Sequence, residues 1–140
     1  MKNVNEVVEV VSSSYLDDYW YDIKLHDVSN MITKLSDPDF RYLFDLTTDK
    51  PKVWLIRYIE AVGKDDSQRS AKAIEQIILN DDDDDIFVIG ADALQSMESR
   101  VVIDYERCLQ KSNELLRRSY SMIDQSVIRR FIQALMRKIN

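Results

Sequence analysis

Glycine and proline are scarce in this chain, which has two of each among its 140 residues. β-Hairpins and sandwiches use both residues in their turns, so this scarcity argues against them and favours helices throughout. The single cysteine, Cys108, excludes an intramolecular disulfide and is compatible with a reducing compartment. The single histidine, His26, excludes the zinc motifs that need a histidine pair.

Long apolar runs are also missing. No stretch approaches the roughly 18 apolar residues that a membrane-spanning helix requires. The N-terminal apolar stretch contains Glu6 and Glu9, which is not typical of a signal peptide. A glycine-rich phosphate loop cannot be built from Gly63 and Gly90. We therefore expect a soluble, cytoplasmic protein with no membrane partner and no cofactor.

The residues that are present predict a single all-α domain spanning residues 1–140. Apolar residues make up 45% of the chain and include seven Tyr, four Phe and two Trp, which excludes a disordered tail. A chain of this length buries roughly two-thirds of its unfolded surface and needs no disulfide or metal to fold. Its apolar residues recur at the spacing of amphipathic helices.

Caps and breaks in the apolar spacing set the expected helix boundaries. Pro51 is expected to start a helix that Gly63 ends in a left-handed conformation. A break near Asp27 is expected to separate two helices. The spacing from Val101 to Leu116 predicts one helix, with Cys108 on its buried side. Ser36 and Ser121 are expected to cap the helices that follow them, and Asp65, Asp66 and Ser67 are expected to open another.

Two pairs of similar segments indicate an internal repeat. Residues 33–46 resemble residues 77–94, with an offset of 44 from Leu35 to Leu79, whereas residues 53–63 resemble residues 86–96 with an offset of 33. The first offset lies in the range of two-helix repeats. The two offsets disagree, so the sequence predicts either a right-handed stack of antiparallel helix pairs, HEAT-like or armadillo-like, or an irregular helical bundle.

Charge is distributed unevenly along the chain. Residues 1–100 hold 11 Lys and Arg against 21 Asp and Glu, a net charge of −10, whereas residues 101–140 hold 8 against 4, a net charge of +4. An acidic body repels nucleic acid and attracts basic proteins. The arginines of the C-terminal segment are expected to pair with acidic neighbours, so we expect no nucleic-acid partner.

Five consecutive aspartates form the strongest local signal: Asp81, Asp82, Asp83, Asp84 and Asp85. One or two of them can cap the helix that follows and favour its positive end. The others are expected to form either a docking surface for a basic partner or a solvated loop. The run lacks the alternating ligands, central glycine and distal glutamate of an EF-hand, so we expect no metal site.

The segment SYLDDYWYDIKLHD combines aromatic and acidic residues. On an α-helix, Leu16, Trp20 and Ile23 share one face. A second face carries Tyr15, Tyr19, Asp22 and His26. Aromatic anchors beside carboxylates suit recognition of a protein rich in Lys or Arg. In the alternative interpretation, the two tyrosines pack under a neighbouring helix.

Neither His26, the candidate base, nor Cys108, the candidate nucleophile, suggests catalysis. His26 could act as an acid or base with Asp22 one turn earlier, but a lone histidine beside carboxylates is typical of a helix surface. Cys108 lies on an apolar stripe, whereas a reactive thiol needs an exposed, electropositive setting. We therefore predict no catalytic residue, and an enzyme that uses Asp22 and His26 is the alternative.

A small, acidic, helical protein without an active site resembles the immunity proteins of bacterial toxin systems, including those of contact-dependent growth inhibition. The resemblance rests on LSDPDFRYLFDL, LNDDDDDIFVIGADAL and LDDYWYDIKLHD. It implies a cytoplasmic protein that binds a cognate basic toxin domain, often a nuclease, and blocks its active site or substrate surface. A helical adaptor or regulatory subunit with a different partner is the alternative.

The expected partner-binding residues follow from charge and periodicity. They comprise the acidic and aromatic side chains of three segments: Tyr15, Asp18, Tyr19 and Asp22 in the first, Asp37 and Asp39 in the second, and Asp81, Asp82, Asp83, Asp84 and Asp85 in the third.

Overall fold

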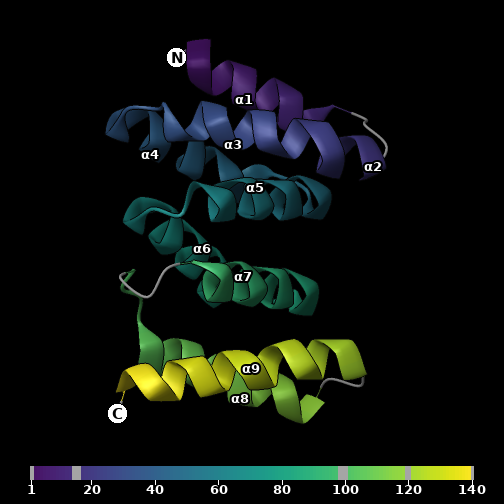
Figure 1. The fold of residues 1–140 in the computed structure, drawn as a ribbon, viewed down its shortest axis with the longest axis vertical. Coiled ribbons are helices and arrows are strands. Elements are labelled where there is room, and N and C mark those ends of the chain that lie inside the picture. Colours follow the sequence, from purple (N-terminus) through teal and green to yellow (C-terminus); the bar gives the residue numbers. More distant parts are fainter. Residues whose placement is uncertain (1, 14–16, 98–100, 119–120, 140) are drawn as a thin grey trace. The chain divides into compact units, whose positions relative to one another are not determined.

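The computed structural model describes residues 2–13, 17–97, 101–118 and 121–139, which Figure 1 shows as helices joined by short connections. These residues form eight helices, with the continuous stretch Asp17–Thr33 counted as one, and no strand, which confirms the predicted all-α class. They divide into two compact units, Met1–Asp65 and Asp66–Asn140.

The first unit contains five helical segments and two irregular turns. They are α1 (Lys2–Ser12), α2 (Asp17–Tyr19), the π-helical turn η1 (Trp20–Lys24), α3 (Leu25–Thr33), α4 (Asp37–Leu46), the 3₁₀ turn η2 (Thr47–Asp49) and α5 (Lys52–Asp65). Helix α3 packs against α1 and α5, and α1 also contacts α4 and α5. The indole of Trp54 stacks on Tyr58 and donates to the hydroxyl of Ser12, 3.2 Å away, which links α5 to α1.

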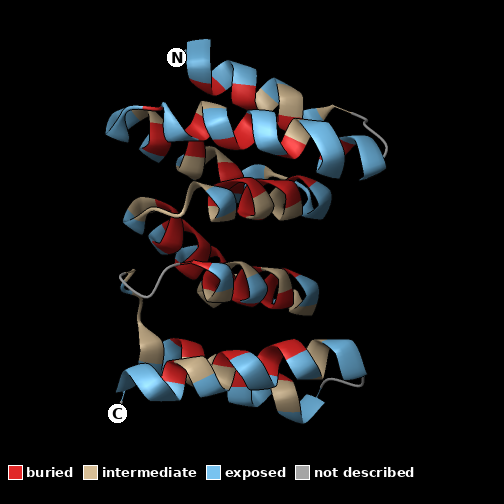
Figure 2. Ribbon diagram, viewed as in Figure 1, coloured by how far each residue is buried: buried red, intermediate tan, exposed pale blue. Residues whose placement is uncertain are grey.

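The second unit consists of two stacked helix pairs. Its helices are α6 (Gln68–Asn80), α7 (Asp84–Ser96), α8 (Tyr105–Arg118) and α9 (Met122–Ile139). Helix α6 packs against α7 and α8 against α9, while α6 also contacts α8 and α7 contacts α9. Between α7 and α9, the rings of Phe87 and Phe131 meet edge to face. Figure 2 shows buried residues on one side of α9 and exposed residues on the other.

The buried side of α8 repeats that of α6. Ala71 and Cys108, Glu75 and Ser112, and Ile78 and Leu115 are buried pairs, each separated by 37 positions. This spacing differs from the predicted offsets of 44 and 33, which came from matching cap residues and apolar runs. The repeat within this unit therefore lies in burial and packing, because a pair such as Glu75 and Ser112 shares no side-chain chemistry.

The two predicted hydroxyl caps are confirmed, and Ser67 provides the cap of α6. Ser36 accepts a hydrogen bond from the backbone N–H of Asp39, Ser67 from Ser70, and Ser121 from Asp124, each at 3.2 Å. These bonds satisfy N–H groups that have no partner within the first helical turn.

Three predicted boundaries were wrong. Helix α5 continues past Gly63 to Asp65, and the residue with positive φ is Asp66, at 50°. Aspartate adopts this conformation more readily than most residues because its short side chain hydrogen-bonds locally. The helix around Asp27 is continuous from Asp17 to Thr33. Residues 101–104 are not helical, and α8 begins only at Tyr105.

Side chains of α6 hold the connection that precedes α8. Gln68 donates to the carbonyl of Val102 at 2.6 Å and accepts from its N–H at 2.7 Å. Two turns later, the buried carboxylate of Glu75 accepts from the N–H of Asp104 at 2.7 Å and pairs with Lys72. The carboxylate of Asp104 in turn caps α8 by accepting from the backbone N–H of Arg107. These side chains thus provide hydrogen-bond partners for backbone groups of Val102 and Asp104, which lie outside a helix.

Candidate functional site

The aspartate run connects α6 to α7, and much of it serves that connection. The carboxylate of Asp83 caps α7, accepting from the N–H groups of Asp85 at 2.9 Å and Ile86 at 3.2 Å. The carboxylate of Asp81 accepts from the N–H of Asp83 at 2.8 Å, which closes the turn. Capping by one or two aspartates was predicted, and Asp83 provides the cap.

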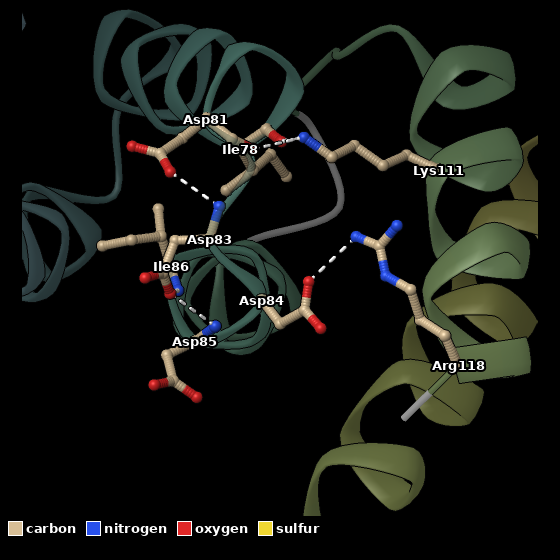
Figure 3. A network of polar contacts seen from close by, with 8 residues as sticks. All are labelled: Ile78, Asp81, Asp83, Asp84, Asp85, Ile86, Lys111 and Arg118. Carbon is tan, nitrogen blue, oxygen red and sulfur yellow. Dashed lines mark hydrogen bonds and ion pairs between the residues drawn. The ribbon is translucent and has the colours of Figure 1, made fainter. Parts of the chain in front are cut away.

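Two cations of α8 reach the same connection (Figure 3). Lys111 donates to the carbonyl oxygens of Ile78 at 2.5 Å and Asp81 at 2.6 Å, which lie at the C-terminal end of α6. Arg118 donates to Asp84 at 2.9 Å. Burial lowers the pKa of Lys111, and the charges of Asp82 and Asp81 oppose that shift. Arg118 thus pairs with an aspartate of the chain's own acidic run, as predicted for arginines of the C-terminal segment.

Some aspartates of the run therefore make structural contacts, and the others are exposed to solvent. Asp81, Asp83 and Asp84 make the contacts described above, and all three are half-buried. Asp82 and Asp85 are exposed, and Figure 3 shows the carboxylate of Asp85 pointing away from Lys111 and Arg118. The surface that this run offers to a basic partner is consequently smaller than five aspartates suggest.

A π-helical turn interrupts the helix that carries the aromatic and acidic segment. The N–H of Leu25 donates to the carbonyl of Trp20, five residues earlier, where an α-helix would join residues four apart. Trp20 and Leu25 are both buried as a result. Ile23 was predicted to face inward with Trp20, but the wider turn rotates it outward, where it is 46% exposed.

This turn places large apolar side chains and carboxylates together on the surface. Tyr19 is 42% exposed and Tyr21 is 50% exposed. Asp17, Asp18 and Asp22 are also exposed. We call Asp18, Tyr19, Asp22 and Ile23 the Tyr19 surface. Tyr15, which was predicted to belong to it, lies outside the described residues.

The buried side of the π-helical turn is fixed by α5. The guanidinium of Arg57 lies over the ring of Trp20, 4.9 Å from its centroid, and donates to the carbonyl of Ser13 at 2.8 Å.

The hydroxyl of Tyr21 donates to Glu60 at 3.4 Å. Burial raises the pKa of Glu60, and the Tyr21 hydrogen bond and the Arg57 charge oppose the shift. Burial, followed by the charge of Glu60, raises the pKa of Tyr21 to about 12.

The second predicted segment lies at the start of α4. Asp37 and Asp39 belong to its first turn, where carboxylates interact favourably with the positive end of the helix. Asp37 is exposed and Asp39 is half-buried. On the same helix, Tyr42 is 41% exposed and lies outside the Tyr19 surface.

The two residues considered for catalysis have ordinary settings. His26 is exposed on α3, and its Nε2 lies 3.3 Å from the side-chain nitrogen of Asn30. Cys108 is buried as predicted, and burial, followed by the charges of Glu75 and Asp104, raises its pKa to about 12. Across the described residues, no group of three or more His, Cys, Asp or Glu side chains is placed to hold a metal ion.

Comparisons with protein-family models, curated proteins and solved structures gave no match. Among the helices described, none combines the length and apolar character needed to cross a membrane.

Sequence reasoning missed two buried charged residues and the π-helical turn. Arg57 and Glu75 are buried, and each interrupts an apolar helical pattern, which is the signal that could have identified them. The turn at Trp20–Lys24 has a weaker signal, namely an apolar step of five from Trp20 to Leu25 in place of three or four.

Proposed function

We propose that this chain is a cytoplasmic immunity protein that binds a cognate basic toxin domain, a nuclease, and blocks its active site or substrate surface. The Tyr19 surface is the observation that carries the proposal. It presents a large aromatic and a large aliphatic side chain to solvent beside two carboxylates, and Tyr21 and Asp17 adjoin it in sequence. An exposed aromatic side chain beside carboxylates suits recognition of a protein rich in Lys or Arg.

The proposed inhibition has an electrostatic component and an apolar component. A nuclease holds phosphate groups with Lys and Arg side chains, and carboxylates such as those of Asp18 and Asp22 can pair with the same cations. Exposed Asp82 and Asp85 add to the negative field that draws a basic domain toward the chain. Charge mainly raises the association rate, whereas buried aromatic anchors give affinity and specificity.

A helical adaptor or regulatory subunit is the second candidate. It is favoured by the second unit, in which α6 and α7 stack on α8 and α9 as successive pairs do in repeat proteins that bind partners along their surfaces. Such an adaptor would bind its partner without protecting a cell from a toxin.

Co-expression with candidate basic toxin domains, such as a variable C-terminal domain encoded by a neighbouring gene, tests the proposal. The expected result is cell survival and co-purification of the two proteins. A His26→Ala variant should protect as well as the unaltered chain, because neutralisation by binding needs no acid or base. Cell death despite folded protein contradicts the proposal, as does survival without a complex or loss of protection in folded His26→Ala.

A further inference from the structure

The ring of Tyr19 already holds a cation of its own chain. The ammonium of Lys24 lies over this ring, 5.6 Å from its centroid. The two residues are five positions apart, which on an α-helix places side chains on different faces. The π-helical turn between them contains more residues per turn, so Lys24 lies beside Tyr19 instead. This contact identifies the face of Tyr19 as a place where a cation binds.

The residues near Tyr19 add two carboxylates and an aliphatic side chain to this cation site. Asp18 and Asp22 are four residues apart, which places them about one turn from each other in an α-helix and in the wider π-helical turn alike. Tyr19 and Ile23 have the same relationship, which places an aromatic ring beside an aliphatic side chain. All four side chains are exposed, so a partner can reach them. The surface therefore offers paired carboxylates, a ring face and an apolar contact within about one turn.

We propose that the Tyr19 surface binds a basic protein segment through one arginine, whose guanidinium replaces Lys24 over the Tyr19 ring and pairs with Asp18 and Asp22. An apolar side chain next to that arginine packs on Ile23. This inference rests on the proposed function, since it names the chemistry by which the basic partner is held.

Arginine fits this surface better than lysine does. A guanidinium is planar, stacks on aromatic rings and pairs with carboxylates through several N–H groups at once. It is also less strongly hydrated than an ammonium group, so it is displaced from water more easily. The aliphatic contact with Ile23 adds an apolar requirement that poly-lysine does not meet. The surface thus selects a segment in which arginine and apolar residues are neighbours.

Amide NMR titration of the full chain with a capped peptide, acetyl-RLRLRL-amide, tests the proposal. Saturable shifts are expected at the amides of residues 18–24. The matched peptide acetyl-KLKLKL-amide should bind more weakly, and acetyl-ELELEL-amide should produce no shifts there. Shifts confined to Asp81–Asp85, or equal affinity for the arginine and lysine peptides, would overturn the proposal.

Four variants separate the ring from general charge and from folding. Tyr19→Leu should weaken binding by about two- to fivefold, the range for a cation on an exposed ring, whereas Tyr19→Phe keeps the ring and should bind normally. Tyr42→Leu is the matched control, because Tyr42 is 41% exposed and Tyr19 42%. Lys24→Met should bind more tightly, since it removes the competing cation. Equal effects of Tyr19→Leu and Tyr42→Leu contradict the proposal.

The toxin assay distinguishes failure of this inference from failure of the proposed function. Tyr19-dependent peptide binding without protection from the toxin overturns the immunity function and leaves the arginine site intact. Full protection and unchanged toxin affinity in a folded triple variant, Asp18→Asn, Tyr19→Leu and Asp22→Asn, overturn the arginine site and leave the immunity function intact.

Discussion

Lys111 of α8 donates to the backbone carbonyl of Asp81, 2.6 Å away, and so connects the second helix pair to the end of α6. The same ammonium group donates to Ile78. Carbonyl groups without a partner inside the helix carry partial negative charge at a helix C-terminus, which makes a half-buried cation an effective partner for them. The acidic run thus begins where α6, α7 and α8 meet. Its backbone carbonyl and its carboxylates both accept hydrogen bonds there.

Lys111→Met should lower the free energy of unfolding by about 1–3 kcal/mol, because it removes charged hydrogen bonds from half-buried carbonyl groups. Urea denaturation measures the change. Arg118→Met is the matched control: its ion pair with Asp84 joins side chains that are 57% and 46% exposed, so it should cost less than about 1 kcal/mol. Equal losses in the two variants would show that the Lys111 contacts contribute no more than a surface pair.

Asp83→Ala should destabilise the protein by about 1 kcal/mol through loss of the α7 cap, and Asp83→Asn by less, since asparagine also caps helices. Thermal denaturation followed by circular dichroism measures both. Asp82→Ala removes an exposed neighbour and should change stability by less than about 0.5 kcal/mol. A loss in Asp82→Ala that matches that in Asp83→Ala would contradict the assignment of the cap.

Gly90→Ala should destabilise the protein by about 1–3 kcal/mol, although alanine favours helices, because a Cβ atom at this position would meet the Cγ2 methyl of Ile78. Helix α7 therefore approaches α6 closely at Gly90. The check is a double-mutant cycle with Ile78→Ala, which removes that methyl. The two changes should be less costly together than their separate effects predict, and strict additivity would rule out the clash.

Stability should fall as pH rises from about 9 towards 12. The thiol of Cys108 has an ordinary pKa of 9.0 and a folded-state pKa of about 12, so the unfolded chain loses this proton first. A raised folded-state pKa gives a contribution that is complete below the unfolded pKa and is lost above it. Unfolding free energies measured from pH 8 to 11 should decline less steeply for Cys108→Ala. Identical slopes for the two proteins would contradict the burial of this thiol.

Features set by neighbouring residues in the sequence were predicted better than contacts between helices. Ser36 and Ser121 were recognisable as caps because a hydroxyl before an apolar helical pattern has one common use. The burial of Cys108 followed from its place on an apolar stripe. These features depend on residues close in sequence, so local spacing is sufficient to predict them.

Features that depend on distant contacts could not be predicted in this way. The spacing of Ile23 fits a core position of an α-helix. The structure exposes it because a π-helical turn forms where Trp20 packs against Arg57 of α5, a contact that local spacing does not reveal. Lys111 occupies a typical surface position of an amphipathic helix, and its role depends on carbonyl groups about 30 residues away. The aspartate run likewise looked like surplus charge until Lys111 and Arg118 were placed beside it.

Titration of the purified toxin domain with this chain tests the central claim most directly, that the protein acts by stoichiometric binding. Residual toxin activity should fall linearly and reach zero at about one molar equivalent, and light scattering should detect a one-to-one complex. Tyr19→Leu should raise the amount required, while Tyr42→Leu should not. Abolition of toxin activity by a small fraction of an equivalent, with no complex detected, would contradict the account and show that the chain turns over a substrate.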